Sequence, residues 1–283
     1  MSAGATPLDT SRYVVRPGEA VRLSERPTDD TQGWTKDAAK AETARLIERM
    51  QALQERLYAE SRQSLLVVFQ AMDGAGKDST TRSVLGPLNP QGVHVRSFKA
   101  PSPEERAHDF LWRVHAAVPQ AGRIAVFNRS HYEDVLVVRV RGLAPPDVVE
   151  ARYEHIRAFE RLLGEARTRI VKFMIHVSPA YQLRQFVERV EDPAKHWKFN
   201  PADLDDRRLW PAFMEAYEIA MSRTSTDAAP WIVVPAETKW FRNLLVARVL
   251  VDTLEAMDPQ FPPPAFDPAE WTAERVERDG RIG

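Results

Sequence analysis

The chain has 283 residues, of which 43% are hydrophobic and 28% are charged, as in a folded globular protein of one or two domains. Its 39 basic residues nearly balance its 40 acidic residues, so the basic excess common in nucleic-acid-binding proteins is absent, and any anion site must be local. The sequence has no cysteine, which excludes disulfides, thiolate metal sites and a cysteine nucleophile.

The apolar runs are too short to cross a membrane. Even the longest runs, such as residues 65–69, are far below the roughly 20 residues that a spanning helix needs. Residues 1–10 lack the charged start and apolar stretch of a signal peptide. We therefore expect a cytoplasmic protein that contacts neither a membrane nor nucleic acid.

Most of the chain alternates between strand and helix patterns. Residues 1–35, rich in Pro, Asp, Thr and Gly, predict an extended arm, and residues 35–60 predict an amphipathic helix. Short apolar runs separated by helical segments then predict an α/β fold with a doubly wound, mostly parallel, five-stranded sheet. The predicted strands are 64–70, 93–98, 124–127, 170–177 and 231–234, and the intervening helices include 103–117 and 147–164.

A helical insertion separates the fourth and fifth predicted strands. It covers residues 178–230, has helical patterns over 180–190 and 203–221, and predicts a lid at about 180–222. After a last helix at 240–257 the chain becomes proline-rich. The sequence therefore predicts one core domain over residues 36–257 and a C-terminal tail over 258–283.

A glycine-bearing loop, Ala71–Thr80, follows the first predicted strand and precedes a helix. Glycines allow backbone N–H groups to turn toward an anion, and the helix N-terminus adds partial positive charge. Lys77 could reach the β- and γ-phosphates of a ligand. The loop departs from the Walker A motif at Ala71 and Asp78, and the alternative is a tight turn with an incidental lysine. The predicted phosphate-binding residues are Gly74, Ala75, Gly76, Lys77, Asp78 and Ser79.

Two carboxylates of this loop are candidate metal ligands. Asp73 would repel an anionic substrate unless a metal or a proton intervened, which favours a Mg²⁺ ligand or a base. The sequence supports two roles for Asp78 equally: it can stabilise the first helical turn, or it can replace the hydroxyl that usually binds Mg²⁺.

The third strand ends in polar residues at the edge where α/β proteins bind ligands. Asn128 stands where a Walker B strand has an aspartate, so a metal must take its carboxylates elsewhere. Arg129 is a candidate clamp for a phosphoryl group, with a surface ion pair as the alternative. Glu133 fits catalysis and a helix capping box with Ser130 equally well.

The insertion has as many acids as cations, so charge alone predicts only a solvated helix pair. The cations of the insertion can contribute to phosphate binding only if the fold turns them toward the glycine loop. They are Arg184, Arg189, Lys195, Lys198, Arg207 and Arg208, and the acids are Glu188, Glu191, Asp192, Asp203, Asp205 and Asp206.

Several segments resemble, in order, those of the family 2 polyphosphate kinases. They are residues 69–80, 89–92, 97–99, 108–113, 127–133, 195–199 and 229–236. The sequences of residues 128–130 and 198–201 resemble the third class of that family. The resemblance covers residues 40–257. The family usually has glycine in place of Ala71 and Ser79, and we expect only a slightly tighter loop.

The resemblance implies a thymidylate-kinase-like P-loop fold with a helical lid. It implies a homo-oligomer that transfers phosphoryl groups reversibly from polyphosphate to AMP and ADP, using Mg²⁺ with Mn²⁺ as a substitute. The resemblance places Asp73, Lys77, Asn128, Arg129 and Glu133 around the transferred phosphoryl group and the metal. We predict that Asp73, Lys77, Arg129 and Glu133 are catalytic and that Asp73, Asp78 and Glu133 are the metal ligands. Further implied ligand-binding residues are Asn128, Tyr132 and Arg113 near the loop, and Arg184, Arg189, Lys195 and Lys198 in the lid.

Two rival functions remain at this point. An ATP-dependent nucleoside monophosphate kinase would use the same loop and metal. A nucleotide-binding switch would bind tightly with little turnover.

Overall fold

A computed structural model describes residues 7–281, and within them six strands form one sheet in the order β1-β6-β5-β2-β4-β3. Strands β2 to β6 are parallel, and β1 pairs antiparallel with β6. The strands are β1 (Val14–Val15), β2 (Ser64–Gln70), β3 (Val93–Ser97), β4 (Ile124–Asn128), β5 (Thr168–His176) and β6 (Trp231–Pro235). Every residue of β2, β4 and β6 is buried, as expected for strands covered by helices on both faces.

The prediction of an α/β fold with a mostly parallel sheet is confirmed, but the predicted number of strands is wrong by one. The sixth strand, β1, comes from the segment expected to be an extended arm. Val15 and Leu23 of this segment are buried, and the carbonyl oxygen of Leu23 lies 3.2 Å from Nε2 of His176. A two-residue strand has no periodicity, so its pairing with β6 could not be detected in the sequence.

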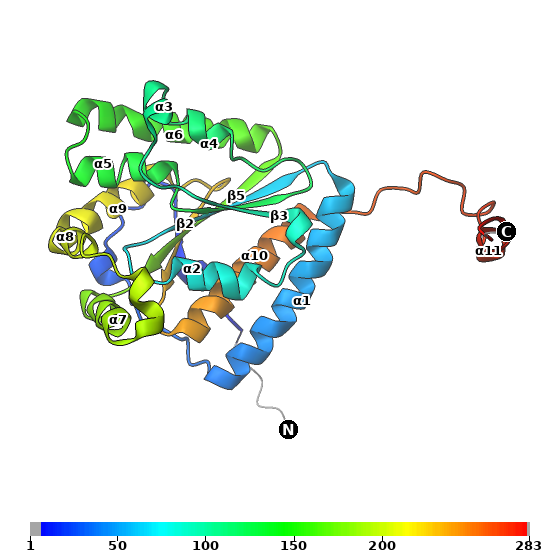
Figure 1. Ribbon diagram of the computed structural model, residues 1–283, viewed down its shortest axis with the longest axis horizontal. Coiled ribbons are helices and arrows are strands. Elements are labelled where there is room, and N and C mark those ends of the chain that lie inside the picture. The colour runs from blue at the N-terminus through cyan, green and yellow to red at the C-terminus, as the bar shows by residue number, and fades with distance from the viewer. Residues whose placement is uncertain (1–6, 282–283) are drawn as a thin grey trace.

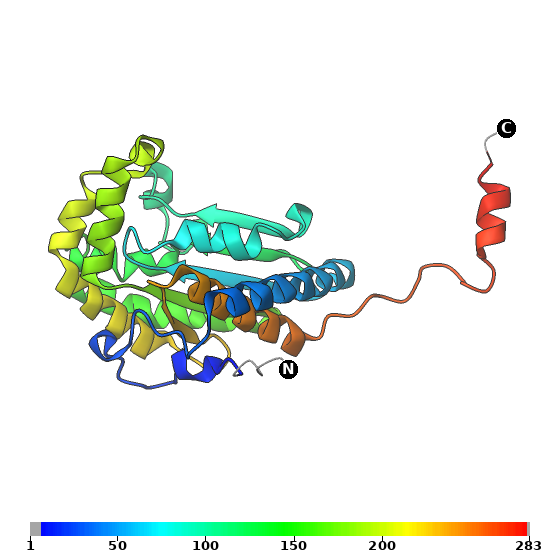
Figure 2. The same cartoon turned by 90° about the horizontal axis from the view of Figure 1, so that it is seen from below.

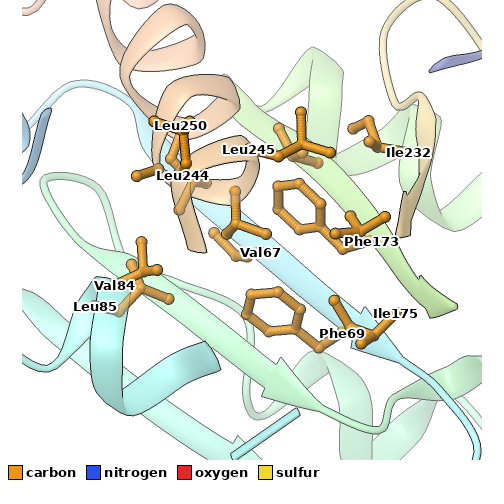
Figure 3. Packing of buried hydrophobic residues seen from close by; sticks show 14 of the residues in the cluster. Val67, Phe69, Val84, Leu85, Phe173, Ile175, Ile232, Leu244, Leu245 and Leu250 are labelled. Atoms are coloured by element: carbon orange, nitrogen blue, oxygen red, sulfur yellow. The ribbon is translucent and has the colours of Figure 1, made fainter. Parts of the chain in front are cut away.

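One face of the sheet packs against three helices (Figure 1). These are α1 (Lys36–Glu60), α2 (Lys77–Thr80), which continues into the π-helical segment η3 (Thr81–Leu85), and α10 (Lys239–Met257). Figure 3 shows Val67 of β2 beneath Leu244 of α10 and Phe69 farther along the strand, near Ile175. The rings of Phe69 and Phe173 stack with their centroids 5.2 Å apart. This core fixes the end of β2, where the glycine loop begins.

The other face of the sheet is covered mainly by α6 (Pro146–Glu165) and α9 (Trp210–Thr224). Leu66 and Val68 of β2 point to this side and share a core with Ile156 and Met221. Alternate residues of β2 therefore belong to two different cores, which holds the strand from both faces.

Two predicted helices are each divided in the structure. The segment 103–117 forms α3 (Pro103–Ala107) and α4 (Trp112–His115), because the side chain of Asp109 accepts a hydrogen bond from the N–H of Leu111 and turns the chain. The segment 203–221 forms α8 (Asp203–Arg208) and α9, because a proline in the first turn of α9 favours a new helix start there.

The first part of the insertion, residues 178–208, lies at the end of the molecule near α2, whereas the C-terminal tail extends away from the body (Figures 1 and 2). The insertion begins with α7 (Pro179–Glu191) and η6 (Pro193–Lys198), and the tail contains α11 (Ala273–Asp279). The remaining short helices are η1 (Thr10–Tyr13), η2 (Leu23–Glu25), η4 (Pro90–Gly92), η5 (His131–Asp134) and α5 (Val137–Val140). Over residues 7–281, no helix is both long enough and apolar enough to span a bilayer.

Candidate active site

The glycine loop turns sharply from β2 into α2. Gly74 and Gly76 have φ values of 82° and 104°, a region that residues with a side chain rarely adopt. A Cβ atom on Gly74 would also lie 3.0 Å from the ring of Phe186, in α7. The loop therefore depends on glycine at these two positions, and the insertion packs directly against it.

Lys77 is held inside the loop. Its Nζ donates to the carbonyl oxygen of Ala71 at 2.7 Å and lies 3.9 Å from Oδ1 of Asp73. Only 7% of the residue is exposed. Burial lowers the pKa of Lys77, while the charge of Asp73 acts in the opposite direction. The structure therefore places a cation among the backbone groups that would surround a bound phosphate.

Arg129 follows β4 and reaches across to the same loop. Its backbone has a φ of 59°, a strained value for a residue with a side chain, and its N–H donates to the carbonyl of Phe69. The guanidinium Nη2 donates to both carboxylate oxygens of Asp73, at 2.7 and 2.9 Å. Burial raises the pKa of Asp73, but the charges of Lys77 and Arg129 outweigh it and lower that pKa overall.

Glu133 points to the end of β2. Its Oε1 accepts a hydrogen bond from Gln70 Nε2 at 2.8 Å, and the Oε1 of Gln70 accepts one from Ser130 Oγ. Ser130 caps its short helix by accepting from the N–H of Tyr132. Among the described residues the Glu133 carboxylate bonds to Gln70, not back to the Ser130 backbone, so the capping-box reading is wrong and the carboxylate faces the site.

Asp73, Arg129 and Glu133 line one small cavity of about 30 Å³ with residues from the insertion. The added residues are Gln182 of α7, Asp203 and Asp206 of α8, and Phe213 and Tyr217 of α9. Gln182 Nε2 also donates to the backbone carbonyl of Asp73 at 2.8 Å. Sequence reasoning missed Gln70 and Gln182, although the position of Gln70 at the carboxyl end of β2 was a usable signal.

Asp78 lies apart from this cavity. Its carboxylate accepts a hydrogen bond from the amide of Asn128, and both residues line a separate cleft of about 390 Å³. That cleft lies between η3 and β3 and includes Arg82 and Val95. The structure thus brings together Asp73 and Glu133, but not Asp78, of the three predicted metal ligands.

Tyr132 is wrongly predicted as a ligand-binding side chain. It is 0% exposed, and its hydroxyl donates to Glu160 at 2.7 Å. Lys172 Nζ donates to both of them, at 3.0 Å to the tyrosine hydroxyl and 2.6 Å to the carboxylate. The Tyr132 ring lies within the core beneath the sheet, so it anchors the segment after β4 without reaching the cavity.

Arg113 is also occupied by neighbouring protein groups. Its Nη1 donates to the carbonyl of Lys99 at 2.8 Å and lies 3.3 Å from a carboxylate oxygen of Glu105. The guanidinium also lies 5.4 Å from the ring centroid of Phe98. These contacts hold the segment between β3 and α4, and the predicted ligand role of Arg113 stays a prediction.

Three of the four predicted lid cations have carboxylate partners. The ion pairs are Arg184 with Glu237 at 3.7 Å, Arg189 with Asp203 at 3.4 Å, and Lys195 with Glu188 and Asp192 at 2.6 and 2.9 Å. Lys198 lies over the ring of Trp197 and, among residues 7–281, has no carboxylate within ion-pair distance. Only Lys198 of the four is therefore free of a local counter-charge in this part of the chain.

The described residues contain no group of three or more metal-binding side chains around one point. Asp73 and Glu133 are nevertheless two of the four carboxylate residues that line one cavity, the others being Asp203 and Asp206 of α8. Mg²⁺ is typically held by one or two carboxylates together with substrate phosphates and water. The donor set therefore fits a Mg²⁺ ion that arrives with a phosphate ligand.

A larger hollow, of about 810 Å³, lies at the opposite end of the sheet, where β5 begins. It is lined by residues such as Arg161, Arg167 and Thr168. We place the phosphate chemistry at the glycine loop because open α/β sheets bind ligands outside the carboxyl ends of their strands.

The sequence model described as Polyphosphate kinase 2 (PPK2) matches residues 33–262. The AMP/ADP-polyphosphate phosphotransferase of Meiothermus ruber is 49% identical over 255 residues, 89% of this chain and 96% of the relative. The ADP-polyphosphate phosphotransferase of Rhodopseudomonas palustris is 41% identical, over 90% of this chain and 93% of the relative. The crystal structure of polyphosphate kinase 2 from Arthrobacter aurescens TC1 superposes with a TM-score of 0.88 at 42% identity, covering 94% of this chain and 95% of that one.

Proposed function

Because this chain belongs to the polyphosphate kinase 2 family, we propose that it transfers phosphoryl groups from inorganic polyphosphate to AMP and to ADP. The observation that carries the assignment to a site is the convergence of Lys77, Arg129, Asp73 and Glu133 at one end of the sheet. The order of strand, glycine loop, lysine and helix supports a P-loop fold.

The reaction needs positioning and charge compensation more than covalent catalysis. Lys77, Arg129 and the loop N–H groups hold the terminal phosphoryl group of polyphosphate. An oxygen of the acceptor phosphate forms a bond to that phosphorus, and the bond to the bridging oxygen breaks. The shortened polyphosphate leaves with the electron pair. The acceptor is already ionised, so a strong general base is not required.

Asp73 and Glu133 are the residues that would hold Mg²⁺ in this site. When bound, the ion would neutralise charge on the donor and acceptor phosphates. The hydrogen bond from Gln70 orients Glu133, and the bond from Gln182 fixes the backbone of Asp73. Asp78, paired with Asn128, is better placed to hold the start of α2 than to bind this ion.

The first part of the insertion, α7 to α8, acts as the lid, whereas α9, which the predicted lid included, packs in the core against the sheet. Its helix α7 contacts the loop through Phe186 and Gln182. A movement of α7 would therefore change the packing against Gly74 and the hydrogen bond to Asp73. We expect Lys198 to meet polyphosphate first and Arg189 to do so after it leaves Asp203. The homo-oligomer implied by the resemblance stays a prediction.

The proposal is tested by incubating the protein with polyphosphate, Mg²⁺ and AMP, ADP, GMP or GDP, and separating the products by chromatography. The expected products are ADP and ATP from the adenine nucleotides. An absence of any phosphorylated product from AMP or ADP would contradict the proposal, and the guanine reactions would define base preference.

A further inference from the structure

Arg242 is a buried arginine in the first turn of α10 that sequence reasoning did not single out. It is 1% exposed. Its Nε and Nη2 donate to the side-chain oxygen of Asn243, at 3.2 and 3.0 Å. Among the described residues, its Nη1 has no hydrogen-bond partner, and no carboxylate lies within ion-pair distance of the guanidinium.

Burial and the place in the helix both oppose a positive charge at Arg242, whereas the nearby Tyr181 acts in the opposite direction. A buried cation without a counter-ion is costly, and the first turn of a helix favours anions over cations. Burial lowers the pKa of Arg242 to about 10, which still leaves the group protonated at neutral pH. A buried guanidinium with an unpaired nitrogen in this setting calls for a partner that arrives from outside the chain.

The unpaired Nη1 lies against the phosphate loop. A Cβ atom built on Gly76 would collide with Nη1 and would lie 3.4 Å from Cζ of Arg242. Gly76 immediately precedes Lys77, so α10 brings a second cation to the segment where the loop becomes a helix. Asn243 holds two of the guanidinium nitrogens and leaves the third directed at this segment.

We propose that Arg242 is a second phosphate-loop cation, which positions the Gly76 segment and offsets the negative charge of polyphosphate bound in the loop. The proposal rests on the proposed function, because polyphosphate supplies the missing counter-charge. It assigns to α10, a helix outside the loop and the lid, a direct role in the affinity for the donor. The close approach of Arg242 is a second reason, besides the φ of 104°, why residue 76 must be glycine.

The test compares polyphosphate binding by full-length variants in the absence of nucleotide. Arg242→Met removes the charge at similar length, Arg242→Lys keeps the charge, and Arg248→Met makes the same change at an ion-paired position of the same helix. Isothermal titration with polyphosphate of one defined length and Mg²⁺ gives Kd, and thermal melts without ligand give Tm. We expect Arg242→Met to raise Kd at least tenfold relative to Arg242→Lys, with no loss of Tm, and Arg248→Met to leave Kd unchanged.

A Kd for Arg242→Met within about twofold of that for Arg242→Lys would overturn the proposal and make Arg242 a packing residue. If the Met variant is too unstable to titrate, Arg242→Gln is the neutral variant in the same comparison. Failure of the wild-type protein to bind polyphosphate at all would instead contradict the proposed function, so the two failures are distinct.

Discussion

Arg129 and Asp73 neutralise each other in the structure, since one guanidinium nitrogen donates to both carboxylate oxygens, at 2.7 and 2.9 Å. One of these residues is the proposed phosphate clamp, and the other is a proposed metal ligand. Binding of Mg²⁺ and polyphosphate must therefore replace this ion pair with two new ones, Asp73 to the metal and Arg129 to the phosphate. The resting pair keeps each charge compensated until both ligands arrive.

Replacement of Lys77 by methionine should lower kcat by about 10²- to 10³-fold, the usual cost of removing one preorganised electrostatic contact. The melting temperature should change little, because Met fills similar space and removes a buried charge whose pKa burial already lowers. Steady-state kinetics and thermal melts check both expectations. Lys40→Met, at an exposed position on α1, is the control. Retention of more than a tenth of the activity would remove Lys77 from the site.

Replacement of Glu133 by glutamine separates charge from hydrogen bonding. The Gln side-chain oxygen can still accept the bond from Gln70, so stability should be kept. The negative charge that a metal requires is lost, so activity should fall at least tenfold and recover little at high Mg²⁺. Rates measured across a Mg²⁺ series decide the matter, with Glu165→Gln on the exposed side of α6 as control. Wild-type rates at saturating Mg²⁺ would make Glu133 a purely structural residue.

Lys198 should act on the donor and not on the acceptor. We expect Lys198→Ala to raise the KM for polyphosphate several-fold more than the KM for AMP. The salt dependence of the polyphosphate KM should also become less steep, because one cation–phosphate contact is lost. Lys195→Ala, which removes a cation already paired with Glu188 and Asp192, is the matched control and should have the smaller effect. Equal shifts in both KM values for Lys198→Ala would place the polyphosphate path elsewhere.

Asp134 should make the folded protein less stable as pH rises. Burial raises its pKa from 3.8 to about 6, against the opposing charge of Arg152. The folded state therefore binds the proton more tightly than the unfolded chain, and its relative stability falls between about pH 4 and pH 6, by up to roughly 3 kcal/mol.

Asp134→Asn removes that titration. The free energy of unfolding of the variant, relative to wild type, should increase as pH rises from 4 to 7, as measured by urea denaturation at several pH values. The same substitution at the exposed Asp227 is the control. A difference between Asp134→Asn and wild type that is independent of pH would show that Asp134 titrates normally.

The parallel sheet was predictable because β2, β4 and β6 are continuous apolar runs and helical segments separate its strands. The antiparallel β1 was not, because two valines carry no pattern and their pairing with β6 is decided by tertiary packing. The division of the predicted helix 103–117 depends on a local side-chain bond from Asp109, which competes with the helix in a way that periodicity does not reveal.

The loop and Arg129 were predictable from residue order, since each follows a buried strand at the ligand-binding edge. Tyr132 was misassigned because a polar-tipped aromatic next to the site looks the same in the sequence whether it faces the cavity or the core. Its actual partner Lys172 is 40 residues away in the chain. The unpaired Nη1 of Arg242 could not be predicted from the sequence either, because whether a donor is unsatisfied depends on how the neighbouring segments pack around it.

The most direct measurement of the central claim is the initial rate of ADP formation from AMP with polyphosphate as the sole phosphoryl donor. It should be compared with the rate from AMP with ATP as donor, with the Lys77→Met protein, purified identically, as the blank for contaminating kinases. We predict rapid ADP formation from polyphosphate in the wild type, loss of that activity in the variant, and a much slower reaction with ATP. Product formed only with ATP would contradict the account and identify the chain as a nucleoside monophosphate kinase.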